Sequence, residues 1–218
     1  MDIELMAFQL RRCTLGFKVS ESPWFDSAET TAWFVDRLRS SKRYFEFGTG
    51  GSTYMAAKLG VSFVAVDSDW RFLRAVKRKI ARDGYSVSSQ QTFHYADIGS
   101  TGEWGRPVGE ISSARLEQFR RYSDPPPGCF DDGNLPDLVL VDGRFRAACA
   151  LKALRLLKGQ QGSTIVVDDY VDRPASHVIA DFAPLDKCVG RMAIFEVPDV
   201  IDLKGLDEAI RANEADSE

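Results

Sequence analysis

The chain has 218 residues, 44% of them hydrophobic and 28% charged, with a net charge of −4 at pH 7. This length suits a single domain, spanning residues 1–218, with a sizeable buried core. The acidic balance argues against a broad phosphate-binding face, although a total charge does not register a local basic patch. No stretch approaches the ~18 apolar residues of a membrane span, and the N-terminal residues lack the apolar run of a signal peptide. We therefore expect a cytoplasmic protein without a membrane partner.

The four cysteines, Cys13, Cys129, Cys149 and Cys188, are scattered along the chain and show no C-x-x-C spacing. Metal and redox centres built from cysteine usually show close pairs in the sequence. We expect these thiols to be reduced and mostly buried, as in other cytosolic proteins.

Apolar runs and amphipathic patterns alternate along the chain. The first helix is expected over residues 26–41, where Asp26 followed by Glu29 resembles a capping box. Buried strands are predicted over residues 44–47, 61–66, 92–95, 138–141 and 164–167. Helices are predicted between them, with Asp69 as one N-cap, over residues 52–59, 69–81 and 147–157. Apolar strands that alternate with helices indicate a parallel sheet covered on both faces.

Two further strands near the C-terminus, over residues 186–189 and 191–197, are separated only by Gly190. So short a link cannot be a parallel crossover, so the two strands should pair antiparallel. The expected fold class is α/β: a doubly wound three-layer sandwich whose seven-stranded, mostly parallel sheet carries a C-terminal antiparallel hairpin. A short helix and an acidic tail should follow Leu206.

Residues 98–136 interrupt this alternation. The segment is rich in glycine and proline, and a helical pattern is present only over residues 113–122. Loops this long inside compact domains are usually functional or disordered. Because the segment follows the third strand, it should lie over the carboxyl edge, where α/β sheets bind ligands. We expect a lid or substrate-binding insertion, and a passive excursion of the chain is the alternative.

A glycine-rich loop over residues 48–51 follows the first strand and precedes a helix. Such loops let backbone N–H groups approach a ligand closely. Gly48 and Gly50 fit the spacing of dinucleotide-binding loops, but Thr53 stands where the third glycine would be. Glu46, just before the loop, suits a ligand with a cationic amino-acid group better than a pyrophosphate. A glycine-rich turn without a ligand is the alternative.

Acidic residues also follow the second and third strands. Asp67 lies about twenty residues after the loop begins, where an acid binds ribose hydroxyls in nucleoside-binding folds of this kind. Asp97, followed by Ile98, comes after the third strand, where a carboxylate can accept a hydrogen bond from an adenine amino group. Each acid alone could be a turn former or a helix cap. Together with the loop they outline a single nucleoside.

These residues resemble the pattern of the class I S-adenosylmethionine-dependent methyltransferases, over roughly residues 41–197. The family motif E/D-x-G-x-G-x-G matches Glu46, Gly48 and Gly50, with Ser52 in place of the last glycine. The final antiparallel strand pair of the family resembles the predicted C-terminal hairpin. The resemblance implies S-adenosylmethionine as the cofactor, bound by Glu46, Gly48, Thr49, Gly50, Gly51, Ser52, Asp67, Ser68, Asp97 and Ile98.

The resemblance continues at the fourth strand, where residues 140–143 match a family motif. Asp142 ends this strand, and Asp168 and Asp169 follow the fifth. The arrangement is similar to the metal-dependent catechol- and caffeoyl-type O-methyltransferases, and implies a Mg²⁺ site at Asp142, Asp168 and Asp169. Those enzymes have asparagine where Asp169 stands, and their lysine after the first acid is missing here. Loop-ordering hydrogen bonds from the two adjacent aspartates are the alternative.

Arg144 and Arg146 follow Asp142 at the same edge of the sheet. Guanidinium groups bind carboxylates and phosphates with defined geometry, and ion pairs with the aspartates after the fifth strand are the alternative. We expect Asp142, Arg144 and Arg146 to form the catalytic site, with Asp142 nearest the methyl acceptor and the two arginines orienting it.

The expected function is methyl transfer from S-adenosylmethionine to an oxygen or nitrogen atom of a small, anionic molecule. A non-catalytic S-adenosylmethionine- or nucleoside-binding protein is one alternative, and a nicotinamide-dependent oxidoreductase is another. Nucleic acid is disfavoured as an acceptor, because the basic pattern over residues 71–82 is typical of a solvated helix face. The N/D-P-P-Y/F/W motif of enzymes that methylate amino groups of nucleic acids is also missing.

Overall fold

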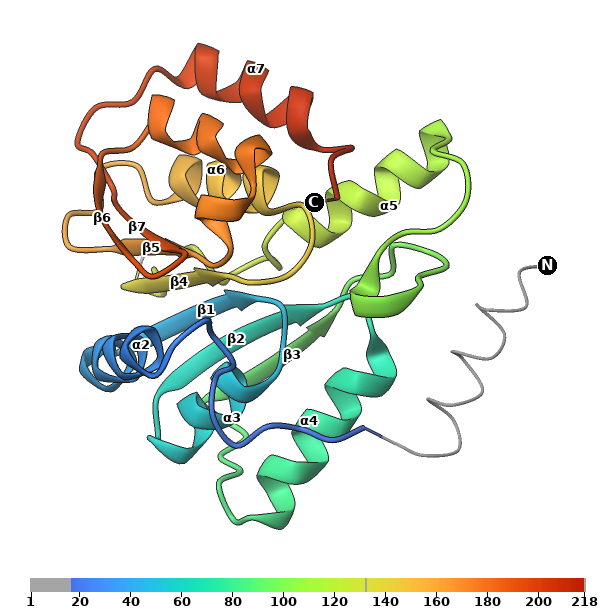
Figure 1. Ribbon diagram of the computed structural model, residues 1–218, viewed down its shortest axis with the longest axis vertical. Coiled ribbons are helices and arrows are strands. Elements are labelled where there is room, and N and C mark those ends of the chain that lie inside the picture. Colours follow the sequence, from blue (N-terminus) through green and yellow to red (C-terminus); the bar gives the residue numbers. More distant parts are fainter. Residues whose placement is uncertain (1–16, 132, 218) are drawn as a thin grey trace.

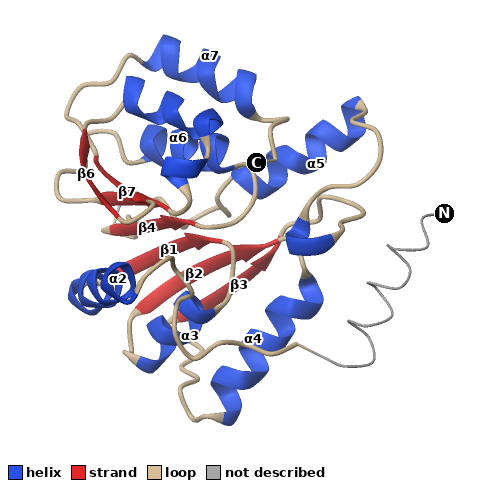
Figure 2. Cartoon of the chain, in the orientation of Figure 1, coloured by secondary structure: helices blue, strands red, loops and turns tan. Residues whose placement is uncertain are grey.

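The computed structural model describes residues 17–131 and 133–217, in which a sheet lies between two layers of helices (Figure 1; Figure 2). Within these residues the sheet has seven strands in the order β3-β2-β1-β4-β5-β7-β6. Neighbouring strands are parallel except β7, which runs antiparallel to both β5 and β6. The strands are β1 (Arg43–Phe47), β2 (Ser62–Asp67), β3 (Gln91–Tyr95), β4 (Leu138–Val141), β5 (Thr164–Val167), β6 (Leu185–Val189) and β7 (Met192–Glu196).

Helices α2, α3 and α4 cover one face of the sheet, and α5, α6 and α7 cover the other (Figure 1). The helices are α2 (Ala28–Ser40), α3 (Gly51–Lys58), α4 (Trp70–Arg82), α5 (Ser113–Ser123), α6 (Arg146–Leu156) and α7 (Leu203–Asn213). Three 3₁₀ segments lie in the connections: η1 (Glu103–Gly105), η2 (Tyr170–Asp172) and η3 (Pro174–Asp181). The expected three-layer α/β sandwich with a C-terminal antiparallel hairpin is confirmed.

Burial on both faces explains why the central strands are apolar without alternation. The four residues of β4 are fully buried, and in β1 only Arg43 is exposed. Side chains along a strand point alternately to the two faces. Phe45 and Phe47 therefore pack in the layer of α5 and α6, whereas Tyr44 and Glu46 point toward α2 and α3.

The predicted strands agree with the structure to within one or two residues, but the prediction of Asp26 as the N-cap of the first helix was wrong. Ser27 caps α2, because its hydroxyl oxygen accepts a hydrogen bond from the backbone N–H of Thr30 at 3.0 Å. The carboxylate of Asp26 instead accepts from the backbone N–H of Arg191 at 3.0 Å. Asp26 thus ties the start of α2 to the β6–β7 hairpin, and Asp69 caps α4 as predicted.

The segment 98–136 divides into a small hairpin and a packed helix. In the hairpin, Gly102 N donates to Arg106 O at 2.8 Å, and Val108 N donates to Ser100 O at 3.1 Å. Its tip is η1, where the exposed Trp104 ring lies 6.1 Å from that of Trp24. Helix α5 follows and packs on the core through two buried aromatic side chains, Phe119 and Tyr122.

The cysteines and helices of the described residues add two observations. Cys149 is buried and Cys129 half-buried, whereas Cys188 is exposed, so the expectation of mostly buried thiols holds only in part. Cys13 and the N-terminal stretch considered for a signal peptide lie outside the described residues. None of the described helices has both the length and the apolar character needed to cross a bilayer.

Candidate active site

The loop between β1 and α3 is held tightly against the neighbouring strand ends. Gly48 has φ of +101°, its N–H donates to Val66 O at 2.8 Å, and a β-carbon there would lie 2.9 Å from the carbonyl oxygen of Asp142. A β-carbon at Gly51 would collide with the carbonyl oxygen of Ser22. At Gly50, by contrast, a β-carbon would meet no atom within 4 Å. The loop is therefore packed on both sides and open at Gly50, beside the N-terminus of α3.

Asp67 joins this loop to the end of β2. One carboxylate oxygen accepts hydrogen bonds from the backbone N–H and the hydroxyl of Thr49, at 2.9 and 2.6 Å. The other oxygen accepts from the backbone N–H of Asp69 at 2.8 Å. The acid predicted to bind ribose is thus positioned by the same loop that was predicted to cradle the nucleoside.

Glu46 lies beneath the loop, on the α3 side of the sheet. Its Oε2 accepts hydrogen bonds from the hydroxyls of Tyr44 and Ser52, both at 2.7 Å. Its Oε1 has no hydrogen-bond partner among the described residues. Complete burial raises the pKa of Glu46 to about 7, although the nearby hydroxyl groups oppose this rise. The carboxylate and Ser52 therefore form a buried support for the loop.

The remaining residues predicted to bind the cofactor lie at the ends of β2 and β3. Asp97 is exposed, and its carboxylate accepts from the backbone N–H of Gly99 at 2.9 Å. Ile98 is fully buried in the core. Ser68 is buried below the hairpin, since a β-carbon at Gly105 would lie 3.3 Å from its hydroxyl oxygen. The tip of the hairpin thus covers the end of β2.

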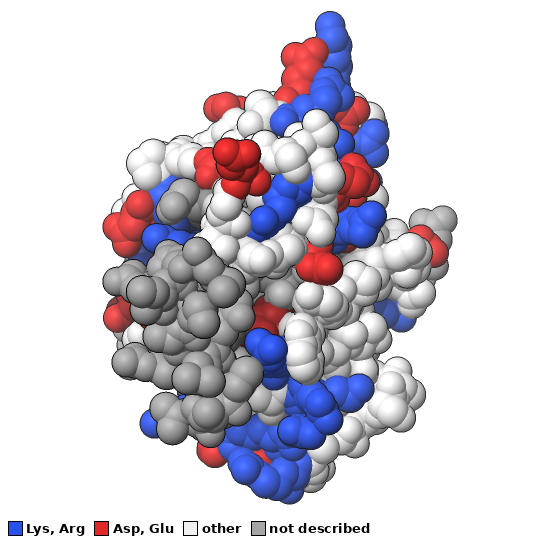
Figure 3. Space-filling view, turned by 90° about the vertical axis from the view of Figure 1, so that its right-hand side faces the viewer, with Lys and Arg blue, Asp and Glu red and all other residues white. Residues whose placement is uncertain are grey.

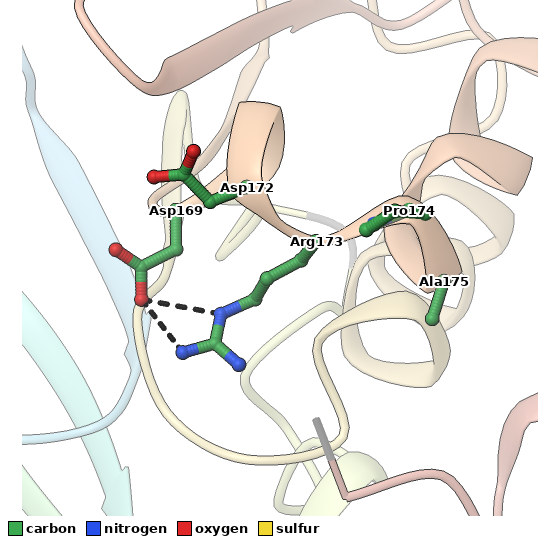
Figure 4. Close-up of a pocket in the computed structure, with 5 residues that line it drawn as sticks. All are labelled: Asp169, Asp172, Arg173, Pro174 and Ala175. Atoms are coloured by element: carbon green, nitrogen blue, oxygen red, sulfur yellow. Dashed lines mark hydrogen bonds and ion pairs between the residues drawn. The ribbon is translucent and has the colours of Figure 1, made fainter.

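The three aspartates predicted to bind a metal lie close together, but arginine side chains form ion pairs with them. Arg191 Nε lies 2.7 Å from Asp169 Oδ1, and its Nη2 lies 3.1 Å from Asp168 Oδ2. Asp169 Oδ2 also pairs with Arg173 Nη2 at 2.9 Å and with Arg146 Nη2 at 3.1 Å. Figure 4 shows the Arg173 guanidinium against the Asp169 carboxylate.

The predicted Mg²⁺ site at Asp142, Asp168 and Asp169 is not supported. Guanidinium groups take up the carboxylate oxygens of Asp168 and Asp169, and their positive charges repel a cation. The described residues also contain no group of three or more side chains of the kinds that bind metal ions. The cluster is instead a network of ion pairs that joins β4, β5 and the β6–β7 hairpin.

Asp142 differs from its two acidic neighbours. Its side chain is 36% exposed, and its nearest cation, Arg146 Nη2, lies at a long 3.4 Å from Oδ1. Although part of the side chain is exposed, the carboxyl group is surrounded by protein, and this burial, followed by the charge of Asp168, raises the pKa of Asp142 to about 7. Asp169 is also partly buried, but its arginine partners lower its pKa. Only Asp142 thus combines access to solvent with a pKa close to neutral pH.

Arg144 and Arg146 are buried arginines with unused hydrogen-bond donors. The Nε and Nη1 atoms of Arg146, and Nε of Arg144, have no hydrogen-bond partner in the described part of the chain. Arg144 is 8% exposed and Arg146 2% exposed. A cavity of about 360 Å³ lies at the same edge of the sheet, lined by Asp169, Asp172, Arg173, Pro174 and Ala175 (Figure 4). The Asp169 carboxylate joins this cavity to Arg146.

Sequence reasoning missed two residues of this site. Arg191 pairs with both Asp168 and Asp169, and the Tyr122 hydroxyl accepts a hydrogen bond from Arg144 N at 3.3 Å. A signal for Arg191 was present, because an antiparallel hairpin beside β5 brings the residue after Gly190 to the carboxyl end of that strand. No such signal existed for Tyr122, which lies in the irregular segment.

Comparison with known proteins agrees with this architecture. The sequence matches no protein-family model and no curated protein. Among solved structures, a methyltransferase-like protein from Silicibacter pomeroyi has a TM-score of 0.73 at 27% identity, over 90% of this chain and 100% of that one. A candidate caffeoyl-CoA O-methyltransferase from Staphylococcus aureus (TM-score 0.48, 14% identity, 90% and 93% covered) is more distant. So is the CcbJ methyltransferase from Streptomyces caelestis (0.42, 18%, 77% and 58%).

The strand order and the match to the Silicibacter protein establish the class. The chain has the fold of the class I S-adenosylmethionine-dependent methyltransferases, as the resemblance in its sequence predicted.

Proposed function

We propose that this protein transfers a methyl group from S-adenosylmethionine to an oxygen or nitrogen atom of a small, anionic molecule. The observation that carries the proposal is the tie between Thr49 and Asp67, which sets the glycine loop and the predicted ribose acid side by side. The fold and the likeness to the Silicibacter methyltransferase-like protein support it. A nicotinamide-dependent oxidoreductase is less compatible with the fold, because dinucleotide-binding sheets of the usual order lack the antiparallel β7.

The loop residues fit a nucleoside with an amino-acid group. Gly50 leaves open space beside the N-terminus of α3, where backbone N–H groups bind negatively charged groups such as a carboxylate. We assign Asp67 to accept hydrogen bonds from ribose hydroxyls, and Asp97, with Ile98 behind it, to accept one from an adenine amino group. Glu46, Gly48, Thr49, Gly51, Ser52 and Ser68 shape and support this surface. S-adenosylmethionine, when bound there, supplies a methyl group on a positively charged sulfur.

Asp142 is the residue we assign as general base. A carboxylate with a pKa near 7 can take a proton from a hydroxyl or an ammonium group at neutral pH, whereas an ordinary aspartate is too weak a base. Its place at the end of β4, beside the β1 loop, supports a role next to the proposed methyl donor. The other task of the protein is to hold the acceptor in line with the methyl group, which supplies much of the rate in such transfers.

The arginines support an anionic acceptor. Unpartnered buried guanidinium donors are costly, and a carboxylate or phosphate would satisfy them. We assign Arg144 and Arg146 to orient the acceptor, with the cavity beside Arg173 as the space that receives it. The hairpin tip over Ser68 would act as a lid on the donor side.

Calorimetric titration with S-adenosylhomocysteine tests the donor site. The wild-type protein should bind it, and Asp67→Asn should bind about tenfold or more weakly, because the amide is a poorer acceptor for two ribose hydroxyls. The exposed Asp131→Asn is the matched control and should bind like the wild type. A folded wild-type protein that binds neither S-adenosylhomocysteine nor S-adenosylmethionine would contradict the proposal. Thermal stabilisation by NAD alone would favour the oxidoreductase.

A methyl-transfer screen with small carboxylates and phosphates that carry hydroxyl or amino groups tests the chemistry. With an accepted substrate, the rate should rise with pH through about 7, as Asp142 loses its proton. Asp142→Asn should lower the rate by about a hundredfold or more and leave S-adenosylhomocysteine binding unchanged. Binding of the nucleoside without transfer to any acceptor would instead indicate a non-catalytic binding protein.

A further inference from the structure

The charge of this acidic protein is unevenly distributed, and α4 is strongly basic. This helix carries six cationic residues and no acidic one: Arg71, Arg74, Lys77, Arg78, Lys79 and Arg82. Because the whole chain has a net charge of −4, the residues outside α4 carry −10 between them. Figure 3 shows lysine and arginine side chains gathered over the lower part of the molecule, where Figure 1 places α4.

Four of these residues form a single stripe along the helix. Arg71, Arg74, Arg78 and Arg82 recur at intervals of three or four residues, which places them on one face. At 1.5 Å of rise per residue the stripe is about 16 Å long. The opposite face packs into the core through Val76 and Ile80, which are at most 1% exposed. The arginine face is therefore the outward one.

Most of the stripe has no acidic partner in the part of the chain that the structure describes. Lys79 pairs with Glu21 and Asp83, both at 2.8 Å, and Arg82 pairs with Asp83 at 3.1 Å. No carboxylate of the described residues lies within ion-pair distance of Arg71, Arg74, Lys77 or Arg78. Among the described residues, four positive charges of α4, three of them on the stripe, are thus left without an acidic partner.

Exposed aromatic rings lie at the end of the stripe that meets the proposed active site. Trp70, the first residue of α4, is 47% exposed, with the Arg71 guanidinium 5.1 Å from its ring centre. Tyr95, at the end of the edge strand β3, is 43% exposed. Since α4 begins just after Asp67 and Ser68, the stripe leads toward the carboxyl edge of the sheet.

We infer that the outward face of α4 docks single-stranded RNA, with the sugar-phosphate backbone on the arginine stripe and a base on Trp70. Cations that track a backbone beside aromatic rings that accept bases are the combination that binds single-stranded nucleic acid. RNA is the nucleic acid that presents unpaired loops and tails. An anionic membrane fits less well, because the apolar side of α4 is buried and cannot insert. This inference replaces the sequence-based interpretation of residues 71–82 as a solvated helix face, and it goes beyond the proposed methyl transfer.

Fluorescence anisotropy with a labelled, ~12-nucleotide oligouridylate RNA tests the surface on the full-length protein. Wild-type binding should weaken as salt rises from about 50 to 200 mM. The double variant Arg74→Glu/Arg78→Glu should bind about tenfold or more weakly, with a salt slope smaller by about 1.4, because two phosphate contacts are lost. Lys204→Glu/Arg211→Glu changes the net charge equally on the exposed face of α7, and its affinity should stay within about twofold of the wild type.

The Trp70→Ala substitution tests the contribution of base stacking to RNA binding separately from that of charge. It should weaken RNA binding about fivefold or more and leave the salt slope unchanged. Circular dichroism melting confirms that each variant is folded. The inference is overturned if the α4 and α7 double variants lose affinity equally, if no RNA binds at low salt, or if the stripe binds only vesicles containing phosphatidylserine. It is also overturned if single-stranded DNA of the same sequence binds more tightly than the RNA. None of these outcomes bears on S-adenosylhomocysteine binding, so this test and that of the methyl donor fail independently.

Discussion

Among the described residues, Glu46 and Asp142 are the two acidic side chains whose pKa values rise to about 7, and both adjoin the β1 loop. Burial is the main cause in each case, and the charge of Asp142 adds to the rise at Glu46. They differ in access to solvent, since Glu46 is fully buried whereas the Asp142 side chain is 36% exposed. The first therefore affects stability, and the second is available for proton transfer.

Stability should fall between pH 4.5 and about 7 because of Glu46. Its folded-state pKa lies above its ordinary value of 4.5, so the folded protein keeps a proton that the unfolded chain releases. This contribution is complete below pH 4.5 and is lost as the pH rises through about 7. Because glutamine does not titrate, Glu46→Gln should be more stable relative to the wild type at pH 8 than at pH 5, by up to about 3 kcal/mol.

Chemical denaturation at the two pH values measures this difference. The exposed Glu110→Gln serves as the control and should keep the pH dependence of the wild type. Equal pH dependence in Glu46→Gln and the wild type would show that Glu46 titrates normally in the folded protein.

At the scale of the elements, the two glycines of the β1–α3 loop, Gly48 and Gly50, serve different purposes. Gly48 has a positive φ and lies against the β4 end, so its glycine is a requirement of the fold. Gly50 has extended φ and open space around it, so its glycine is not needed for packing. We infer that the bare backbone at Gly50 serves the ligand.

Two alanine substitutions test this division. Gly48→Ala should destabilise the protein by about 2 kcal/mol or more, since it adds a left-handed backbone strain to a clash with the Asp142 carbonyl. Gly50→Ala should change stability by less than about 0.5 kcal/mol and weaken S-adenosylhomocysteine binding about tenfold or more. Denaturant unfolding and calorimetry measure the two effects. Normal ligand affinity in Gly50→Ala would place the ligand away from the loop.

The sequence predicts the secondary-structure elements well, but it predicts poorly which side chains pair with one another. The buried strands are recognisable because each is an apolar run bounded by turn or cap residues, and the short link at Gly190 requires an antiparallel hairpin. The magnesium prediction is not supported, and this was missed in the sequence because the partner of Asp168, Arg191, lies 23 residues away and meets it through the hairpin. For the same reason Asp26, bonded to Arg191, was mistaken for a helix cap.

At the scale of the whole molecule, the arginine–aspartate network joins the parallel part of the sheet to its antiparallel edge. Asp168 at the end of β5 is 1% exposed, and its charge is paired through Arg191 beside β7. Removal of one partner from a buried pair leaves an uncompensated charge, which costs more than the pair itself contributes.

Arg191→Met should therefore lower the free energy of unfolding by about 2–3 kcal/mol, somewhat less than for a fully buried pair because Arg191 is 33% exposed. Adding Asp168→Asn to this variant should recover part of the loss, since the amide carries no charge. Urea denaturation of the single and double variants measures both values. Full additivity of the two substitutions would show that the pair is not coupled.

The segment between β3 and β4 has one part that packs on the core, α5, and one more exposed part, the hairpin tip. The Tyr122 hydroxyl of α5 fills the space over Gly143, so any side chain there would collide with it. At the hairpin tip, the exposed Trp104 lies beside Trp24, and Gly105 lies over Ser68. We therefore expect relatives to vary in the tip and to retain α5 with its tyrosine. If relatives differ in the ligands that they admit to the edge of the sheet, the sequence differences responsible should be concentrated in residues 102–106.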